Sequence, residues 1–248
     1  MTIDEIYRLV QAFASKDQRG FITPAEFNLM AQQAELELYN ERLQVVMEGS
    51  QAKKIAGYYK KALTPAVAEQ DILTFLYKGE ITLTTGEGFI ISDYICQLYA
   101  TDYTLSVLNS KTLKYEDKTT TITNQLAVDV VTTKNVGQIQ RSSLVKPSLD
   151  FPVALLSSNA GSVNVSVFPS TITKISCYYY LYNNKPTWNY VTIAGKPVYD
   201  SSNSTAFKIS SRCHGELVIK ILGYLGVSIR EADLVNYAQA KEVEQDKV

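Results

Sequence analysis

Apolar residues recur at helical spacing through residues 1–71, so we expect this region to be helical. The first helix is predicted to begin at a capping box formed by Thr2 and Glu5. Its apolar positions are Ile3, Ile6, Val10 and Phe13. A weaker helix is expected over residues 51–63. The region should therefore form a helical hairpin or bundle.

A long helix is predicted from Pro24 to Glu48, with Gly49 as the residue that ends it. At 1.5 Å per residue it is about 37 Å long. One apolar stripe contains Phe27, Met30, Ala31, Ala34 and Leu38, and an opposed stripe contains Leu36, Tyr39, Leu43 and Met47. A surface helix needs only one apolar stripe, so this helix should lie between two neighbours. Either both neighbours belong to the same chain or one is another subunit. The second stripe is our candidate subunit interface.

Residues 72–210 have a different composition, with short stretches rich in Thr, Val, Ile and Tyr separated by Gly, Asn and Pro residues. The stretches are GEITLTTGEGFIIS, TTTITNQLAVDVVTT, GSVNVSVFP, TITKISCYYYLY and NYVTIAGKPVY. This pattern is typical of strands and hairpins. Tyrosine is abundant here, and it suits half-buried strand surfaces and interfaces alike. We expect a small antiparallel β-sandwich or barrel.

Residues 211–248 return to a helical pattern. The apolar stripe of the first helix here is Leu217, Val218, Ile221, Leu222 and Leu225, with Gly226 as its end. A capping box from Ser228 to Glu231 is predicted to open a last helix. The predicted fold class is therefore α+β: a helical region, a central β-rich domain, and C-terminal helices that pack back on the N-terminal helices.

Composition and charge narrow the function classes. The formal net charge is −1, and no block of the chain is basic enough to grip phosphates over a broad face. The first ten residues have acidic side chains and no apolar core, so we expect no signal peptide, and no run of about 18 apolar residues predicts a membrane span. The three cysteines are scattered and odd in number, which favours free thiols in a reducing cytoplasm.

The stretch from Ser15 to Phe27 resembles a calcium loop in part. With Gly20 at position 6, Arg19 stands where the third ligand should be, and Ser15 replaces the first carboxylate. Glu26 has another role, because Thr23 and Glu26 form a capping box around a Pro at the first helical position. A calcium-binding module is thus the least favoured hypothesis, and we interpret Gly20 as part of a joint between two helices.

Catalytic signatures are incomplete, and we expect no enzyme, cofactor or metal. His214 is the only histidine, and at the start of a predicted helix it should be a surface residue. Gly86 and Gly88 lack the third glycine and the following helix of a dinucleotide loop, so they indicate a hairpin turn. Glu35 and Glu37 lie on different helix faces and cannot share a proton.

Two segments resemble structural proteins of crAss-like and related phages of Bacteroides. The first is SKDQRGFITPAEFNLMAQQAELELYNERL. The second is YYYLYNNKPTWNYV, followed by VYDSSNSTAFKIS and HGELVIKILGYLGVSIREADLVNYAQAKEVE. They cover about 100 of the 248 residues in the same order as in that family, and they contain no catalytic signature.

The resemblance implies a collar or head-to-tail connector protein that forms a ring, expected to be a dodecamer, below the portal. Its partners would be copies of itself, the portal protein or other collar rings, and DNA that passes through the lumen without sequence-specific binding. It would be made in the bacterial host cytoplasm, reside in the virion and touch no membrane. A near-neutral charge suits such a conduit, because a strongly basic lumen would hold DNA. The alternative is a tail-associated or host-surface-binding virion protein that uses the Tyr-rich β domain.

Overall fold

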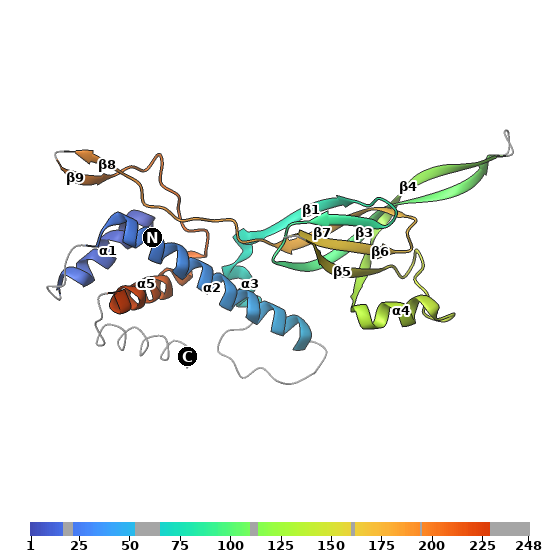
Figure 1. The fold of residues 1–248 in the computed structure, drawn as a ribbon, viewed down its shortest axis with the longest axis horizontal. Coiled ribbons are helices and arrows are strands. Elements are labelled where there is room, and N and C mark those ends of the chain that lie inside the picture. Colours follow the sequence, from blue (N-terminus) through green and yellow to red (C-terminus); the bar gives the residue numbers. More distant parts are fainter. Residues whose placement is uncertain (17–21, 53–64, 110–113, 160–161, 194, 229–248) are drawn as a thin grey trace. The chain divides into compact units, whose positions relative to one another are not determined.

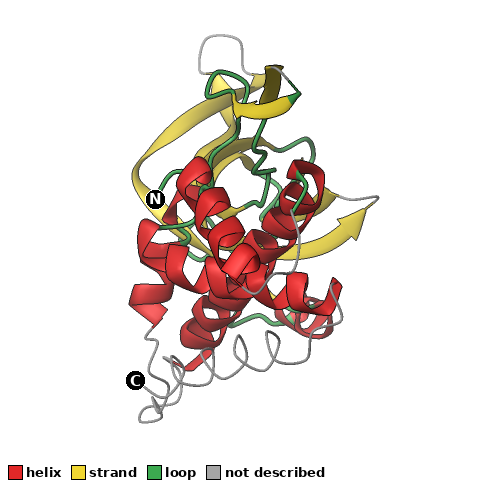
Figure 2. Ribbon diagram, turned by 90° about the vertical axis from the view of Figure 1, so that its left-hand side faces the viewer, coloured by secondary structure: helices red, strands yellow, loops and turns green. Residues whose placement is uncertain are grey.

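The computed structural model describes residues 1–16, 22–52, 65–109, 114–159, 162–193 and 195–228. Within these ranges the chain is α+β, with five α-helices and a mostly antiparallel, nearly closed barrel (Figures 1 and 2). The predicted fold class is confirmed at this level. Contacts within the chain define two compact units. We call Met1–Phe75 with Tyr182–Val248 the helical unit, and Leu76–Leu181 the β unit.

In its described residues, the helical unit contains four α-helices, two short 3₁₀ helices and a two-stranded ribbon. These elements are α1 (Ile3–Lys16), α2 (Pro24–Ala52), α3 (Pro65–Asp71), η1 (Leu73–Phe75), β8 (Tyr190–Ile193), β9 (Lys196–Tyr199), η2 (Ser211–Cys213) and α5 (His214–Ser228). The predicted stripe of α5 is buried at all five positions, Leu217, Val218, Ile221, Leu222 and Leu225. This burial confirms the helical spacing deduced for that segment.

Both capping boxes that lie in the described residues are confirmed. The Thr2 amide donates to Glu5 Oε2 at 2.9 Å, and the Glu5 amide donates to Thr2 Oγ1 at 3.2 Å. Thr23 and Glu26 make the same reciprocal pair at 3.0 and 3.3 Å. Each pair satisfies two amides that the first turn of a helix leaves without partners.

Two predicted helix ends are wrong. Helix α2 continues through Gly49 to Ala52, and α5 continues through Gly226 to Ser228. A glycine inside a helix costs only about 1 kcal/mol relative to alanine, so flanking turns can carry the helix past it. The joint at Gly20, nearly all of the helix at 51–63 and the last helix after Ser228 lie outside the described residues.

The described part of the β unit contains seven strands and one helix, all from one continuous segment of the chain. They are β1 (Leu76–Thr82), β2 (Glu87–Ile90), β3 (Tyr94–Asn109), β4 (Lys114–Val131), α4 (Thr133–Arg141), β5 (Val153–Asn159), β6 (Ser162–Phe168) and β7 (Ile172–Tyr180). The sheet order is β1-β7-β3-β4-β5-β6-β2. All neighbours are antiparallel except β4 and β5, which are parallel and joined through α4.

The ends of the sheet order are adjacent in the chain, which brings the barrel close to closure. A tight turn joins β1 to β2, with Gly86 at φ +85° and reciprocal backbone hydrogen bonds between Thr84 and Glu87 of 2.8 and 3.1 Å. The predicted hairpin turn is thus confirmed. A Cβ at Gly88 would lie 2.4 Å from Ile81 Cγ2, so β2 packs directly against β1 there. The core inside the barrel includes Leu98, Ala100, Val165, Ile172 and Ile175.

The β-rich region predicted at 72–210 divides in the structure. Residues 76–181 form the β unit, whereas residues 182–210 belong to the helical unit. We call residues 182–209 the strap, because apart from the β8–β9 ribbon it has almost no regular secondary structure. The strand signal at 189–199 was correct for the ribbon but gave no information on which unit the ribbon joins.

Candidate assembly surfaces

The second apolar stripe of α2 is covered mainly by the chain itself. Tyr39 is 1% exposed and Leu43 is 7% exposed, while Leu36 is half-buried and Met47 is 36% exposed. The ring of Tyr39 lies 5.0 Å from that of Phe75, within the same unit. Our assignment of Tyr39 and Leu43 to a subunit interface is therefore wrong. The first of the two alternatives holds for them, because other segments of the same chain bury them.

Polar side chains of α2 that the sequence analysis did not connect to any partner hold the strap. Asn28 exchanges two hydrogen bonds with the Trp188 backbone, at 2.7 and 3.2 Å, and Gln32 donates to the Pro186 carbonyl at 3.2 Å. Asn28, Gln32 and Glu35 are spaced by four and three residues, so they lie on one helix face. Their spacing was visible in the sequence, but nothing there indicated a partner.

Glu35 is fully buried and accepts four hydrogen bonds. The Lys208 and Ile209 amides donate to Oε1 at 2.6 and 3.2 Å, and Asn184 and Tyr182 donate to Oε2 at 2.8 and 3.2 Å. Burial raises the pKa of Glu35, while these hydrogen bonds act in the opposite direction. The carboxylate fastens both ends of the strap to α2.

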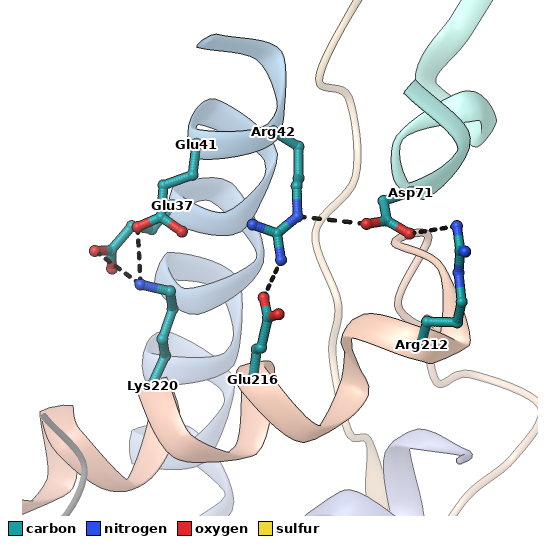
Figure 3. Close-up of polar contacts among 7 residues, drawn as sticks. All are labelled: Glu37, Glu41, Arg42, Asp71, Arg212, Glu216 and Lys220. Carbon is teal, nitrogen blue, oxygen red and sulfur yellow. Dashed lines mark hydrogen bonds and ion pairs between the residues drawn. The ribbon is translucent and has the colours of Figure 1, made fainter. Parts of the chain in front are cut away.

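A second polar cluster joins α2, α3 and α5 (Figure 3). Arg42 is buried and pairs with Asp71, at 3.4 Å from Nε, and with Glu216. Asp71 also accepts from Arg212 at 2.8 Å. Two guanidinium groups and two carboxylates thus balance in charge, as a buried ionic group requires. We interpret this cluster as structural.

The strap is also anchored by the Lys-Pro-x-Trp stretch that contributes to the phage resemblance. Trp188 is buried, its ring centroid lies 4.2 Å from that of Tyr7, and its Nε1 donates to Asp4 at 3.0 Å. Tyr190 and Tyr199 of the ribbon stack on the same indole at 5.7 and 5.8 Å. A groove of about 650 Å³ lies between α1 and β9 at this point.

Tyrosines of the β unit contact one another across strands. The Tyr77 and Tyr179 rings stack at 5.9 Å, and the Tyr99 and Tyr178 rings meet edge to face at 6.2 Å. Lys78 lies over the Tyr178 ring at 5.7 Å. Such cross-strand pairs stabilise a sheet. Packing thus accounts for these four tyrosines.

The connection between β4 and β5 presents apolar side chains to solvent. Leu144 is 95% exposed, Phe151 is 78% exposed and Val145 is 64% exposed. The Ser142 hydroxyl accepts from the Leu144 and Val145 amides at 3.3 and 3.2 Å, which shapes the loop that carries them. We call residues 130–151 the connection surface.

Helix α4 of the connection surface is poorly supported by its own chain. None of its nine residues is buried, and its N-cap Thr132 makes no side-chain capping hydrogen bond. Isolated helices shorter than about 12 residues are marginal in water. Exposed Leu, Val and Phe side chains beside an exposed short helix form an apolar patch, and such patches are typical of binding surfaces.

The histidine of the sequence and the cysteine beside it are both buried. His214 is 7% exposed, so the expectation of a surface histidine is wrong, and burial lowers its pKa. Burial raises the pKa of the neighbouring Cys213 thiol to about 12, so it is protonated at neutral pH and a poor nucleophile. The described residues contain no group of three or more His, Cys, Asp or Glu that could hold a metal ion.

In the part of the chain that the structure describes, no helix is long and apolar enough to cross a membrane. Comparison with known proteins finds no family model and no curated protein that match this chain.

Proposed function

We propose that this chain is a virion structural protein, a ring-forming subunit of a portal-proximal collar that surrounds the DNA exit channel. The observation that carries the proposal is the connection surface. Burying a Leu, Val or Phe side chain contributes roughly 1.5–3 kcal/mol, so the exposed Leu144, Val145 and Phe151 favour a bound protein partner. The choice of a phage collar among possible assemblies rests on the resemblance of the two sequence segments.

In this proposal the helical unit forms one bundle in which the C-terminal helices pack back on the N-terminal helices. Ion pairs between α2 and α5 support that arrangement, including Lys220 at 3.2 Å from Glu37. The partners are further copies of the chain, the portal protein or another collar ring. DNA passes through the lumen without sequence-specific contacts, which suits the near-neutral net charge of −1. The tyrosine pairs do not favour the host-binding alternative.

The test is the size and shape of the purified protein and its place in the virion. We expect closed rings in negative-stain images, a matching mass in solution, and antibody labelling at the neck of the particle. Leu144→Asp with Phe151→Asp should abolish the rings. Leu29→Asp is the matched control, because Leu29 is 64% exposed but lies on α2. Antibody labelling only at the distal tail or on host cells would contradict a collar role.

A further inference from the structure

The connection surface combines its apolar side chains with unbalanced positive charge. Residues 133–151 contain the cations Lys134, Arg141 and Lys146 and one carboxylate, Asp150. Within the described residues none of the three cations forms an ion pair, and all three are exposed. A partner for this surface should therefore present carboxylates beside an apolar contact.

The helical unit carries a surface with the opposite character. Glu37, Glu41, Gln44 and Glu48 are spaced by four, three and four residues, so they form one stripe along α2. Glu37 is 40% exposed and Glu41 is 45% exposed, and Gln44 and Glu48 are exposed as well. Lys220 lies 3.2 Å from Glu37 and 3.0 Å from Glu41, and Figure 3 shows its ammonium between them. We call this row the acidic stripe.

Among the ion pairs of the described residues, a single ammonium faces the two carboxylates of Glu37 and Glu41, so this pair of glutamates keeps a net negative charge. Met47, at the edge of the stripe, is 36% exposed and supplies an apolar contact. The two surfaces are thus complementary in charge, and each has an apolar component. The two surfaces lie on different units of the chain. The contact therefore does not require either surface to be complementary to itself.

We propose that the connection surface of one copy docks on the acidic stripe of a second copy. The contact is heterologous, since two different surfaces meet, and repetition of a heterologous contact closes a ring when the rotation allows. This inference rests on the proposed function, because it names the faces through which ring subunits would meet. It also gives Met47, alone among the four residues first assigned to the interface, a place beside a partner.

The test uses two charge-reversed full-length proteins. The first carries Arg141→Glu and Lys146→Glu, which makes the connection surface acidic. The second carries Gln44→Lys and Glu48→Lys, which makes the stripe basic and leaves Lys220 with both of its partners. Each variant should lose self-association, with a dissociation constant weakened at least about tenfold, because like charges then meet. A one-to-one mixture should associate as wild type does, since each acidic surface then finds a basic one.

The matched control is Lys185→Glu with Lys196→Glu, which reverses two exposed cations of the helical unit and should leave association unchanged. Circular dichroism melts establish that every variant is folded, and Lys134→Glu alone provides a milder change to the same surface. Mass photometry of wild type, variants and mixture reads out the result, at low and high salt, since screening weakens exposed charge pairs.

The outcomes separate the two proposals. The docking of these two faces would be overturned if the wild type forms rings and each variant still assembles alone. It would also be overturned if the mixture of the two variants stays dissociated while the wild type forms rings. Either result would leave the proposed ring function standing. A wild-type protein that remains monomeric at all concentrations would overturn both. Binding of the wild type to vesicles of anionic phospholipid, without self-association, would replace the second copy by a membrane as occupant of the connection surface.

Discussion

At the scale of single residues, Glu35 fastens the strap to α2 with four donors and no cation. A glutamine there has one acceptor oxygen and one amino group, so two of the four donors would face an NH₂ group. We expect Glu35→Gln to lower the free energy of unfolding by about 1–3 kcal/mol, the cost of buried donors left without acceptors. Urea denaturation measures it, and Glu37→Gln is the control at a half-exposed site.

Glu35 also predicts a pH dependence of stability. Burial raises its pKa in the folded state above the unfolded value of 4.5. Between these two values the folded chain holds a proton that the unfolded chain lacks. The contribution of Glu35 to the unfolding free energy is therefore fully present below pH 4.5 and lost as the pH rises through the raised pKa. The difference in stability between wild type and Glu35→Gln should shrink over that rise. A difference that grows with pH would contradict the raised pKa.

The three cysteines should differ in reactivity. Cys177 and Cys213 are buried, and burial raises the pKa of both thiols, whereas Cys96 is only partly buried. Thiolate is the reactive form, so Cys96 should react first with a thiol reagent at neutral pH. Mass spectrometry of the labelled protein gives the order, and all three should react in denaturant. Rapid labelling of Cys213 in the native protein would show that its surroundings open readily.

Local hydrogen-bonding rules predict some residues well and others not at all. The capping boxes at Thr2 and Thr23 were predictable because both partners lie within three residues of each other. The role of Glu35 was not, because its donors lie about 150 to 170 residues away in a segment without regular structure. The same holds for Tyr39, whose burial depends on Phe75 and Tyr182. An apolar stripe shows that something covers it, but not which segment does.

At the scale of elements, a substitution at Gly88 can test the close approach of β2 to β1 that nearly closes the barrel. An alanine Cβ there would lie 2.4 Å from Ile81 Cγ2 and 3.0 Å from Leu83 Cδ2, so β2 would have to move away from β1. We expect Gly88→Ala to destabilise the protein by about 1–3 kcal/mol, as overpacking does. Gly137→Ala is the matched control. Its Cβ meets nothing within 4 Å inside α4, so it should stabilise the helix by up to about 1 kcal/mol.

Equal melting temperatures of Gly88→Ala and wild type would contradict the close approach of β1 and β2.

Closure of the barrel was not predictable from the strand signals. Alternation and turn residues correctly located β1, β2, β4, β6, β7 and the ribbon, because these signals act within a few residues. The sequence signals did not reveal β5, its parallel pairing with β4, or the crossover helix α4 that connects these two strands. That helix contains Asn, Gly and β-branched residues, which give it a weak helical propensity.

At the scale of the whole molecule, the β unit is an insertion into the helical unit. The chain leaves the helical unit after Phe75 and returns at Tyr182, and the rings of these two residues lie 5.5 Å apart. On the other side of the junction, Leu76 pairs with Tyr180 in the first register position of β1 and β7. Composition placed the second boundary at 210, because the ribbon has the same β-branched and aromatic residues as the barrel strands.

This topology predicts that the helical unit survives removal of the β unit. Replacing residues 76–181 by a short Gly-Ser linker joins two ends that are already neighbours, and the shorter connection lowers the entropy cost of closing the chain. We expect a folded, mainly helical protein with a cooperative thermal transition in circular dichroism. Trp188→Ala in the shortened chain should abolish that transition, because the indole holds Tyr7, Tyr190 and Tyr199 together. A shortened chain that is unfolded while the full chain is stable would show that the helical unit depends on the insertion for its fold.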